Sequence, residues 1–385
     1  MATSPHSLTN NTAAADKPVR DCQVALLSKA EVSDPAFVSE WKILARVAAE
    51  PNPFFEPALL LPALEHFSAR GSVEVLAVRV GNLLCGLMPL ATSPSYYGYP
   101  VPHFTTWLHA NAFCGVPLVA QGLEHAFWRA VLESRDETRG KALFLHLPQL
   151  PSEGPVAASL AAVLEQQQRQ SAIVQSIGRA MLRSESTADE YLHSSLTPKR
   201  RKELRRLKKR FGELGELEFE RQNDRTSAPR WIEEFLELEH SSWKGTQGSA
   251  FASSPTSAAY FRQAMLMAAQ AGTLERLAFR LDGHPIAMLA NLVAAPGVFS
   301  FKTTFDEAYA KYSPGFLLQL ENLELLDRSE IAWADSCAAE GHPMIERLWR
   351  EKRRIQAINV AIGGPIRRAM FKQLMRRETR RKGIS

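Results

Sequence analysis

One short segment of the chain has residue types that could bind a phosphate group. Ser313-Pro314-Gly315-Phe316 lies where a loop is expected to lead into a helix. The first N–H groups of a helix lack intrahelical partners and point at whatever occupies the N-terminus, so an anion fits there. Lys311 could add positive charge beside this turn. A glycine next to a proline is also an ordinary helix start, so the segment predicts either a phosphate cradle or a simple cap.

Two other residues have the types of a general base and its orienting partner. Asp335 ends a strand predicted at 331–336, and His342 opens a helix predicted at 342–352. A histidine beside an aspartate can take up a proton near neutral pH, so the pair is a candidate base. The same sequence also fits a structural helix-start role for His342.

Three residues at the end of another predicted helix are candidates for substrate contact. Glu239, Trp243 and Lys244 come directly before a stretch rich in glycine and serine, 245–254, which is typical of a mobile binding loop. Trp243 as an ordinary core residue is the alternative. No G-x-S-x-G motif or reactive-cysteine setting occurs, so the sequence does not predict a covalent nucleophile.

One segment of the chain that is expected to form part of the scaffold for these residues occurs twice in the sequence. Gly71–Asn82 reads GSVEVLAVRVGN and Gly272–Gly283 reads GTLERLAFRLDG, with Gly, Glu, Leu, Ala and Arg at equal offsets. Each copy ends in a two-residue hairpin signal and continues into an apolar strand. Two distant copies do not make a solenoid. They suggest one duplicated α/β domain, and chance similarity between two hairpins is the alternative.

The alternation of predicted strands and helices indicates an α/β fold. The second half begins with a helix whose start is marked by Thr197 and Pro198, and its predicted order is helix, strand, helix, helix, three strands, helix, strand, helix, strand. Strands are expected at 73–80, 83–90, 104–108, 142–147, 172–182, 216–221, 276–281, 285–293, 298–305, 331–336 and 357–361. Helices are expected at 34–46, 58–67, 123–133, 155–169, 197–214, 230–243, 260–271, 315–327 and 342–352.

Composition places the chain among globular proteins of the cytoplasm. It has 385 residues, 45% hydrophobic and 23% charged, enough for about two domains. Its 4 cysteines are scattered without C-x-x-C spacing, which argues against a disulfide framework or a zinc site and predicts no bound metal. Residues 1–20 are polar, lack the apolar core of a signal peptide and are expected to be disordered. No apolar run has the length of a membrane span.

Positive charge is concentrated in two places. Lys199–Arg210 contains nine basic residues and one glutamate, and Ile366–Ser385 contains eight and one. The net charge of the chain is only +5, so the remainder is acidic. The first patch could be a solvated helix face or a surface for CoA, nucleic acid or a membrane. Nucleic acid is not favoured, because no recognised binding motif is present.

The predicted order of elements resembles the GNAT acyltransferase fold, and three motifs narrow the match. The motifs are LEHSSWKG at 238–245, the loop from Asp306 to Gly315, and Asp335-Ser336-Cys337 followed by GHPM at 341–344. They resemble the CelD-like acetyltransferase domain family, most strongly over about 190–350. The first half resembles the degenerate partner domain of tandem FemABX proteins. The usual GNAT Q/R-x-x-G-x-G/A motif is absent.

This resemblance implies a reaction and adds roles to two residues. A GNAT enzyme binds acyl-CoA as a co-substrate, without a permanently bound cofactor, and an amine attacks the thioester directly. If the strand before Asp306 is the splayed strand of the fold, Asp306 lies near the thioester and could orient or deprotonate the amine. Tyr312 is a candidate acid for the leaving thiolate. A capping role for Asp306 and aromatic packing for Tyr312 are the alternatives.

The expected organisation is a tail at 1–20, a degenerate GNAT-like domain at 21–185, a GNAT acyltransferase domain at 186–362 and a basic amphipathic helix at 363–385. On that helix Ile366, Met370 and Leu374, with Phe371 and Met375, form an apolar stripe flanked by arginines and a lysine. The pattern is typical of a helix on an anionic lipid surface, and a helix docked on the body by the stripe is the alternative.

Together these features predict an acyl-CoA-dependent N-acyltransferase that acts on an amine of a bacterial envelope component, in the cytoplasm and in contact with the inner membrane. The acceptor would be a long-chain sphingoid base, as in a bacterial ceramide synthase, or an amino sugar of an exopolysaccharide precursor. Two alternatives remain. One is a FemABX-like transferase with aminoacyl-tRNA as donor, and the other is a non-catalytic GNAT-fold adaptor at the membrane.

Overall fold

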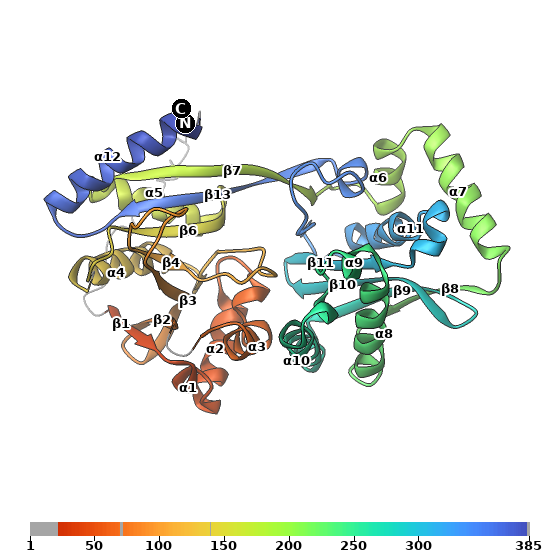
Figure 1. Cartoon of the computed structure of the whole chain (residues 1–385), viewed down its shortest axis with the longest axis horizontal. Coiled ribbons are helices and arrows are strands. Elements are labelled where there is room, and N and C mark those ends of the chain that lie inside the picture. Colours follow the sequence, from red (N-terminus) through yellow and green to blue (C-terminus); the bar gives the residue numbers. More distant parts are fainter. Residues whose placement is uncertain (1–21, 70–71, 139, 383–385) are drawn as a thin grey trace, which may run out of the picture.

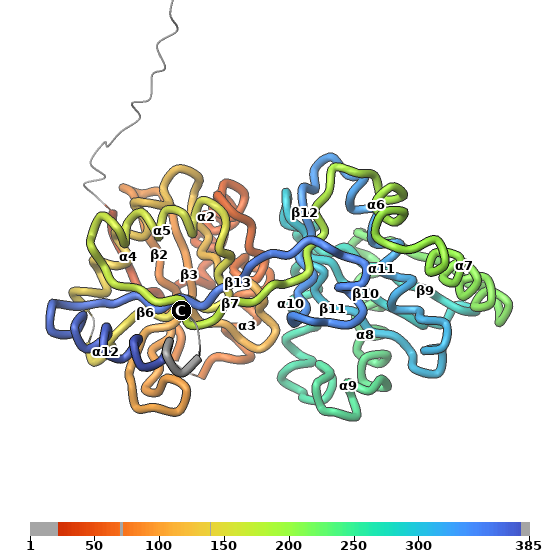
Figure 2. The backbone as a smooth tube through the Cα atoms, turned by 90° about the horizontal axis from the view of Figure 1, so that it is seen from above, coloured from red at the N-terminus to blue at the C-terminus, as the bar shows by residue number. Residues whose placement is uncertain are grey.

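The computed structural model describes residues 22–69, 72–138 and 140–382. The chain forms two lobes, each with a sheet and flanking helices, and long strands cross from one lobe to the other (Figures 1 and 2). The disordered tail expected at 1–20 and Gly71 of the first repeat lie outside the described residues.

The first lobe is built mainly from the first half of the chain. Its strands are β1 (Cys22–Leu27), β2 (Val73–Val80), β3 (Leu83–Ser93), β4 (His103–Thr106), β5 (Leu118–Val119), β6 (Phe144–Pro151) and β7 (Ser171–Leu182). Its helices are α1 (Lys29–Val32), α2 (Pro35–Val47), the short 3-10 helix η1 (Pro53–Phe55), α3 (Pro57–His66), α4 (Glu124–Glu137) and α5 (Pro155–Gln166).

The second half of the chain supplies the second lobe and then returns to the first. Its strands are β8 (Leu217–Gln222), β9 (Leu274–Leu281), β10 (His284–Ala294), β11 (Gly297–Phe305), β12 (Trp333–Asp335) and β13 (Glu351–Ala361). Its helices are α6 (Ala188–Ser195), α7 (Pro198–Gly212), α8 (Ala228–Ser241), α9 (Trp243–Thr246), α10 (Pro255–Ala271), α11 (Pro314–Glu321) and α12 (Pro365–Lys382). Short 3-10 helices are η2 (Phe251–Ser253), η3 (Glu307–Tyr312), η4 (Asn322–Asp327) and η5 (Ile345–Arg347).

The two lobes repeat one topology. The strands lie in the order β1-β2-β3-β4-β6-β13-β7-β12-β11-β10-β9-β8, and β5 pairs with β3. From either outer edge inward, three antiparallel pairings are followed by one parallel pairing, β4 with β6 in the first lobe and β11 with β12 in the second. The hairpins β2–β3 and β9–β10, which contain the sequence repeat, therefore occupy equivalent positions. The chain has a tandem α/β fold.

Local sequence accounts for several of these elements. The β9–β10 turn is Asp282-Gly283, and both residues have positive φ (49° and 77°), as a two-residue hairpin turn requires. Helix α7 begins where Thr197 Oγ1 accepts a hydrogen bond from the Arg200 N–H at 3.3 Å, and Pro198 occupies the first turn. Such short-range patterns work because the chemistry of a cap or turn involves only neighbouring residues.

The helix predicted at 342–352 is wrong. Only the 3-10 turn η5 forms there, and the chain is already extended in β13 from Glu351. Strand β13 lies between β6 and β7 and pairs with both over most of its length. A helix continued to Lys352 would remove the pairing of Glu351 and Lys352 with β7, so the pairing available in the fold overrides the local preference of the sequence at this end of the predicted helix. This strand of the second half thus completes the sheet of the first lobe (Figure 2).

An apolar core continues from one lobe into the other. Helix α3 packs against α10, and Phe54 of η1 places its ring 5.6 Å from that of Phe299 and 5.9 Å from that of Phe301 in β11. Phe54 is 1% exposed. Because buried aromatic contacts of this kind resist shearing, the lobes are held in a defined relation to each other.

Helix α12 packs on the sheet of the first lobe rather than standing apart. Phe371 and Met375 are 1% and 4% exposed, and they pack with Phe144 and Val174. Ile366 is 80% exposed. The apolar stripe expected on this helix is therefore divided: Phe371 and Met375 lie in a core, and Ile366 at its start is exposed to solvent. No helix in the described part of the chain has both the length and the apolar character needed to cross a bilayer.

Candidate functional site

The parallel strands β11 and β12 separate after a short pairing. Gly297–Phe299 pairs with Trp333–Asp335, where β12 ends. Strand β11 continues through Ser300–Phe305, where β10 is its only strand partner among the described residues. The register between β10 and β11 also skips Phe301, which is a β-bulge. The result is an edge of β11, at the junction of the two lobes, that pairs with no other strand of the described part of the chain.

Lys302 lies on this free stretch of β11, inside a group of aromatic rings. Its Nζ atom is 4.9 Å from the ring centroid of Phe251, 5.6 Å from that of Phe113 and 5.9 Å from that of Phe301. Within the described part of the chain, Nζ has no hydrogen-bond acceptor and no ion-pair partner. An ammonium held only by aromatic faces is poorly solvated, so the neutral amine is favoured.

The electrostatics of this position agree with its geometry. The pKa of Lys302 is lowered from 10.5 to about 8, first by burial and then by the positive charge of Lys244. Glu239 and Cys337 act in the opposite direction. At a pH near 8 the side chain is therefore an amine in a large fraction of molecules and can accept a proton.

The predicted substrate residues Glu239 and Lys244 do lie together here. Glu239 is 0% exposed, and its Oε2 accepts a hydrogen bond from the Phe251 N–H at 2.8 Å. Lys244 Nζ lies 3.3 Å from Glu239 Oε1 and donates to the Thr303 carbonyl at 2.7 Å. Lys244 therefore reaches a backbone group of β11 one residue beyond Lys302. Trp243, by contrast, is 46% exposed.

The first lobe also contributes to the Lys302 pocket. Phe113 supplies one of its rings, and His109 lies close enough for the charge of Lys302 to affect it. Burial, and then Lys302, lowers the pKa of His109 to about 4, so this ring is neutral at physiological pH. Its buried Nε2 has no hydrogen-bond partner among the described residues. The candidate site is thus built by both lobes.

The structure shows no hydrogen bond or ion pair between Asp335 and His342, and the predicted base pair stays a prediction. Asp335 is 0% exposed and lies 3.4 Å from Arg179 and 3.2 Å from Arg353. Its Oδ1 also accepts from the Cys337 N–H at 2.8 Å. These contacts join β12 to β7 and β13, so the two arginines occupy the carboxylate that His342 would need.

His342 faces the Lys244 side of the site instead. Burial lowers its pKa, and the positive charge of Lys244 lowers it further against the influence of Glu346. Its Nδ1 lies 3.5 Å from the backbone N of Ile345, a contact longer than an ordinary hydrogen bond. His342 lies before the 3-10 turn η5 rather than at the start of a helix.

Asp306 and Tyr312 both make structural contacts. The Asp306 carboxylate caps η3 by accepting from the Ala308 N–H at 2.9 Å. Tyr312 stacks on Phe211 of α7, with ring centroids 5.3 Å apart and planes 9° apart. Asp306 follows the free stretch of β11 directly, and no contact of its side chain with Lys302 is present. These contacts support the structural alternatives for both residues and leave their catalytic roles as predictions.

The predicted phosphate cradle lies where β11 and η3 lead into α11. Ser313 adopts a left-handed conformation (φ 55°), and Pro314 begins the helix. A Cβ atom at Gly315 would come 3.0 Å from the Phe305 ring, so glycine permits this close approach. Phe316 packs against the guanidinium of Arg200 at 5.4 Å, and Lys311 lies over the Tyr312 ring. The cradle therefore stands next to basic helix α7.

Lys302 is the residue that sequence reasoning missed. It directly follows the largely apolar run Val298-Phe299-Ser300-Phe301. A lysine at this point of a predicted central strand is the available signal, because lysine is rarely buried without a partner. No group of three or more histidine, cysteine, aspartate or glutamate side chains within the described residues could hold a metal ion.

Comparisons with known proteins agree with this architecture. Residues 198–342 match the model of the acetyltransferase (GNAT) domain. No curated protein sequence matches the chain. Among solved structures, FemX is 11% identical with a TM-score of 0.57, covering 88% of this chain and 98% of FemX. The structure of L-PGS from Bacillus licheniformis is 10% identical with a TM-score of 0.54, covering 92% and 99%.

A third structure is the C-terminal domain of a putative lysylphosphatidylglycerol synthetase from Agrobacterium fabrum, which is 13% identical with a TM-score of 0.51, covering 90% of this chain and 96% of that domain. At such identities the likeness concerns the fold. The family match is to the general GNAT domain, and membership of the CelD-like group remains a prediction. Residues 198–342 thus match the GNAT acetyltransferase domain, and the chain that carries this segment in a tandem fold is an N-acyltransferase.

Proposed function

We propose that the chain transfers an acyl group from acyl-CoA to an amine of a bacterial envelope component, and that Lys302 removes the proton from the amine. The supporting observation is the Lys302 side chain at the free edge of β11, which has aromatic faces around it, no hydrogen-bond acceptor among the described residues and a pKa near 8. A group that must be unprotonated to act at neutral pH needs such surroundings.

The reaction needs no covalent enzyme intermediate. The amine nitrogen of the acceptor forms a bond to the thioester carbonyl carbon, and the carbon–sulfur bond breaks. The proton of the amine moves to Lys302 Nζ, and the CoA thiolate takes a proton from that ammonium or from water. The positive charge of Lys244 beside the Thr303 carbonyl stabilises negative charge that develops nearby.

The donor would lie along the free edge of β11, with its pyrophosphate at the start of α11. We expect acyl-CoA at a hundredfold excess over Kd to raise the free energy of unfolding by about 2.7 kcal/mol. Gly315→Asp should abolish this protection, because it adds bulk and negative charge at the helix N-terminus. Thermal unfolding with and without acyl-CoA measures the effect.

The matched control for this prediction is Gly315→Ala. Its Cβ meets the same Phe305 ring at 3.0 Å but adds no charge, so it lowers basal stability while retaining protection by the donor. Equal protection of the Gly315→Asp variant and the unchanged protein would rule out the cradle at Ser313–Phe316.

The acceptor class is proposed from charge and from analogy. Two of the structures with a similar fold are named for lysylphosphatidylglycerol synthesis or as L-PGS, and the first name describes a lipid product. Helix α12 presents exposed Lys372, Arg376 and Arg377, which suit an anionic surface. We therefore place a sphingoid base ahead of an amino sugar. Release of the CoA thiol, with mass analysis of the product, distinguishes sphinganine from glucosamine as acceptor.

We expect the protein to bind vesicles of phosphatidylglycerol at low salt, with about 1 kcal/mol for each basic residue near the surface. Deleting α12 would expose the core under Phe371 and Met375, so the test uses charge reversal of Lys372, Arg376 and Arg377 to glutamate. Vesicle sedimentation should show loss of binding with unchanged thermal stability. Absence of vesicle binding by the unaltered protein would contradict a membrane role for this helix.

A FemABX-like donor is the alternative supported by a specific observation. The exposed basic residues of α7 stand beside the loop that leads to α11, and they could bind the backbone of an aminoacyl-tRNA. The two donors are separable, because the tRNA reaction releases no thiol. Transfer from aminoacyl-tRNA, weakened by salt and lost when Arg205 and Arg206 are replaced by glutamate, would favour the alternative over acyl-CoA.

A further inference from the structure

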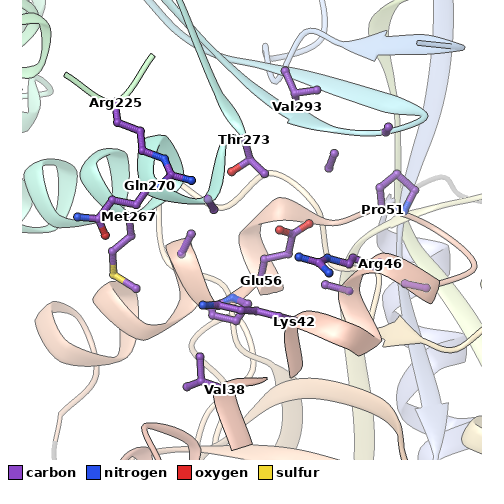
Figure 3. Close-up of a pocket in the computed structure, with 17 residues that line it drawn as sticks. Val38, Lys42, Arg46, Pro51, Glu56, Arg225, Met267, Gln270, Thr273 and Val293 are labelled. Atoms are coloured by element: carbon purple, nitrogen blue, oxygen red, sulfur yellow. The ribbon is translucent and has the colours of Figure 1, made fainter. Parts of the chain in front are cut away.

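A cavity lies between the lobes, and none of its lining residues belongs to the group of aromatic and charged side chains around Lys302. It has a volume of about 620 Å³, within the range of small-molecule sites. Helices α2 and α3 of the first lobe form one side, and α10 with the ends of β9 and β10 forms the other (Figure 3). Much of its wall is apolar, including Val38, Met267 and Val293.

Three positively charged side chains line this cavity. Lys42 and Arg46 come from α2, and Arg225 comes from the segment before α8. All three side chains are exposed, and none has an ion-pair or hydrogen-bond partner among the described residues. Many other arginines of the chain are paired with carboxylates, such as Arg280 with Glu220 and Glu234. Unpaired cations from both lobes around one hollow attract an anion.

The fourth charged residue of the lining is Glu56, which directly follows η1. Figure 3 shows its carboxyl group pointing into the cavity, between Arg46 on one side and Arg225 on the other. Within the described residues the carboxyl group of Glu56 makes no hydrogen bond and no ion pair. Burial raises its pKa to about 7, so it carries a proton in much of the population at neutral pH. A protonated carboxyl can donate a hydrogen bond to an anionic oxygen.

We propose that this interdomain cavity binds a phosphate ester, with the phosphate held by Lys42, Arg46 and Arg225, the Glu56 carboxyl donating to it, and the organic part against the apolar wall. Phosphate suits the site because several donors can share its oxygens. The same chemistry occurs in a soluble ester and in a lipid head group. The apolar walls favour the ester with short hydrocarbon chains over the bare ion. The site is independent of the acyl-transfer pocket.

Calorimetric titration tests the proposal with three probes: inorganic phosphate, glycerol 3-phosphate and dihexanoyl phosphatidic acid below its micelle concentration. We expect binding to strengthen in that order. Lys42→Gln and Arg46→Gln should each weaken binding about tenfold, the loss typical of one charge-assisted hydrogen bond. Arg183→Gln, which removes another exposed and unpartnered arginine, should leave binding unchanged. Lys302→Met should also bind normally, which separates this site from the proposed reaction.

Proton coupling provides the second readout. An anion near Glu56 raises the pKa of this carboxyl further, so near pH 7 the unaltered protein should take up more protons on binding than Glu56→Gln does, which appears as a dependence on the ionisation enthalpy of the buffer. Glu56→Gln keeps the shape of the side chain and supplies an amide donor in place of the carboxyl. Three results would overturn the proposal: no heat with any probe, equal loss of binding in Arg183→Gln, or equal proton exchange by Glu56→Gln and the unaltered protein.

Discussion

Replacing Lys302 with methionine is expected to lower turnover by about two to four orders of magnitude, the usual contribution of a general base. Methionine fills a similar volume among Phe113, Phe251 and Phe301, so the pocket keeps its shape. Donor binding should persist, because the candidate cradle lies beyond the end of β11. The measurement is thiol release from acyl-CoA under saturating acceptor, together with protection by acyl-CoA against thermal unfolding.

The pH dependence of activity in the unaltered enzyme should reflect the ionisation of Lys302. Activity is expected to rise with pH through about 8, the pKa of Lys302, as the ammonium loses its proton. Lys302→Arg should remain inactive over this range, because a guanidinium stays charged. An activity profile without an inflection near pH 8 would argue against Lys302 as the base.

Stability should also rise with pH, over a window that begins near the pKa of Lys302 in the folded protein. The folded state holds the Lys302 proton less tightly than the unfolded state, so stability of the unaltered protein rises as pH increases from about 8 towards 10.5. Below this window the buried ammonium costs stability, and Lys302→Met should be more stable by on the order of 2 kcal/mol at pH 7. A variant that is stabilised and inactive has lost a functional group rather than its fold.

Asp306→Asn is the matched comparison for the Lys302 variants. If Asp306 only caps η3, the change costs about 1 kcal/mol or less of stability and turnover stays within a few-fold. If the large loss of turnover occurs in Asp306→Asn and not in Lys302→Met, Asp306 rather than Lys302 accepts the proton of the acceptor amine. The two residues are close in sequence, so they are tested with one assay and one acceptor.

Asp335→Asn is expected to destabilise the protein by about 3–5 kcal/mol, the usual result of removing one partner from a buried ion pair. The reason is that Arg179, 2% exposed, would keep its charge in the core without the carboxylate. Arg353 would lose its partner as well. Because these contacts join β12, β7 and β13, the loss affects the junction between the lobes.

The denaturant midpoint measures this effect, and Asp189→Asn is its control. Asp189 is 82% exposed in its contact with His193, so its removal should change stability by less than about 1 kcal/mol. At low temperature, where the Asp335→Asn protein is folded, its turnover per folded molecule should remain near normal. A stable but inactive Asp335→Asn protein would restore Asp335 to the chemistry and return attention to His342.

The sequence alone was sufficient where the physics is local. The hairpin turn at Asp282-Gly283 depends on two residues that tolerate positive φ, and the start of α7 depends on the Thr197 hydroxyl and Pro198. The repeated segment correctly indicated a duplicated fold, because two copies of the same residue pattern form the same hairpin in the same place of each sheet. Glu239 and Lys244 are only five residues apart, so their closeness also depends on the local path of the chain.

Tertiary structure decided the rest. The pKa of Lys302 depends on a ring from the other lobe, Phe113, and on Phe251 and Lys244, none of which is near it in sequence. Asp335 and His342 are close in sequence, but the Asp335 carboxylate pairs with Arg353, which β13 brings to it. The stripe on α12 could not be assigned from periodicity, since an apolar face looks the same whether it meets lipid or Phe144. Burial and electrostatic potential arise from segments that meet only on folding, and sequence spacing does not record those meetings.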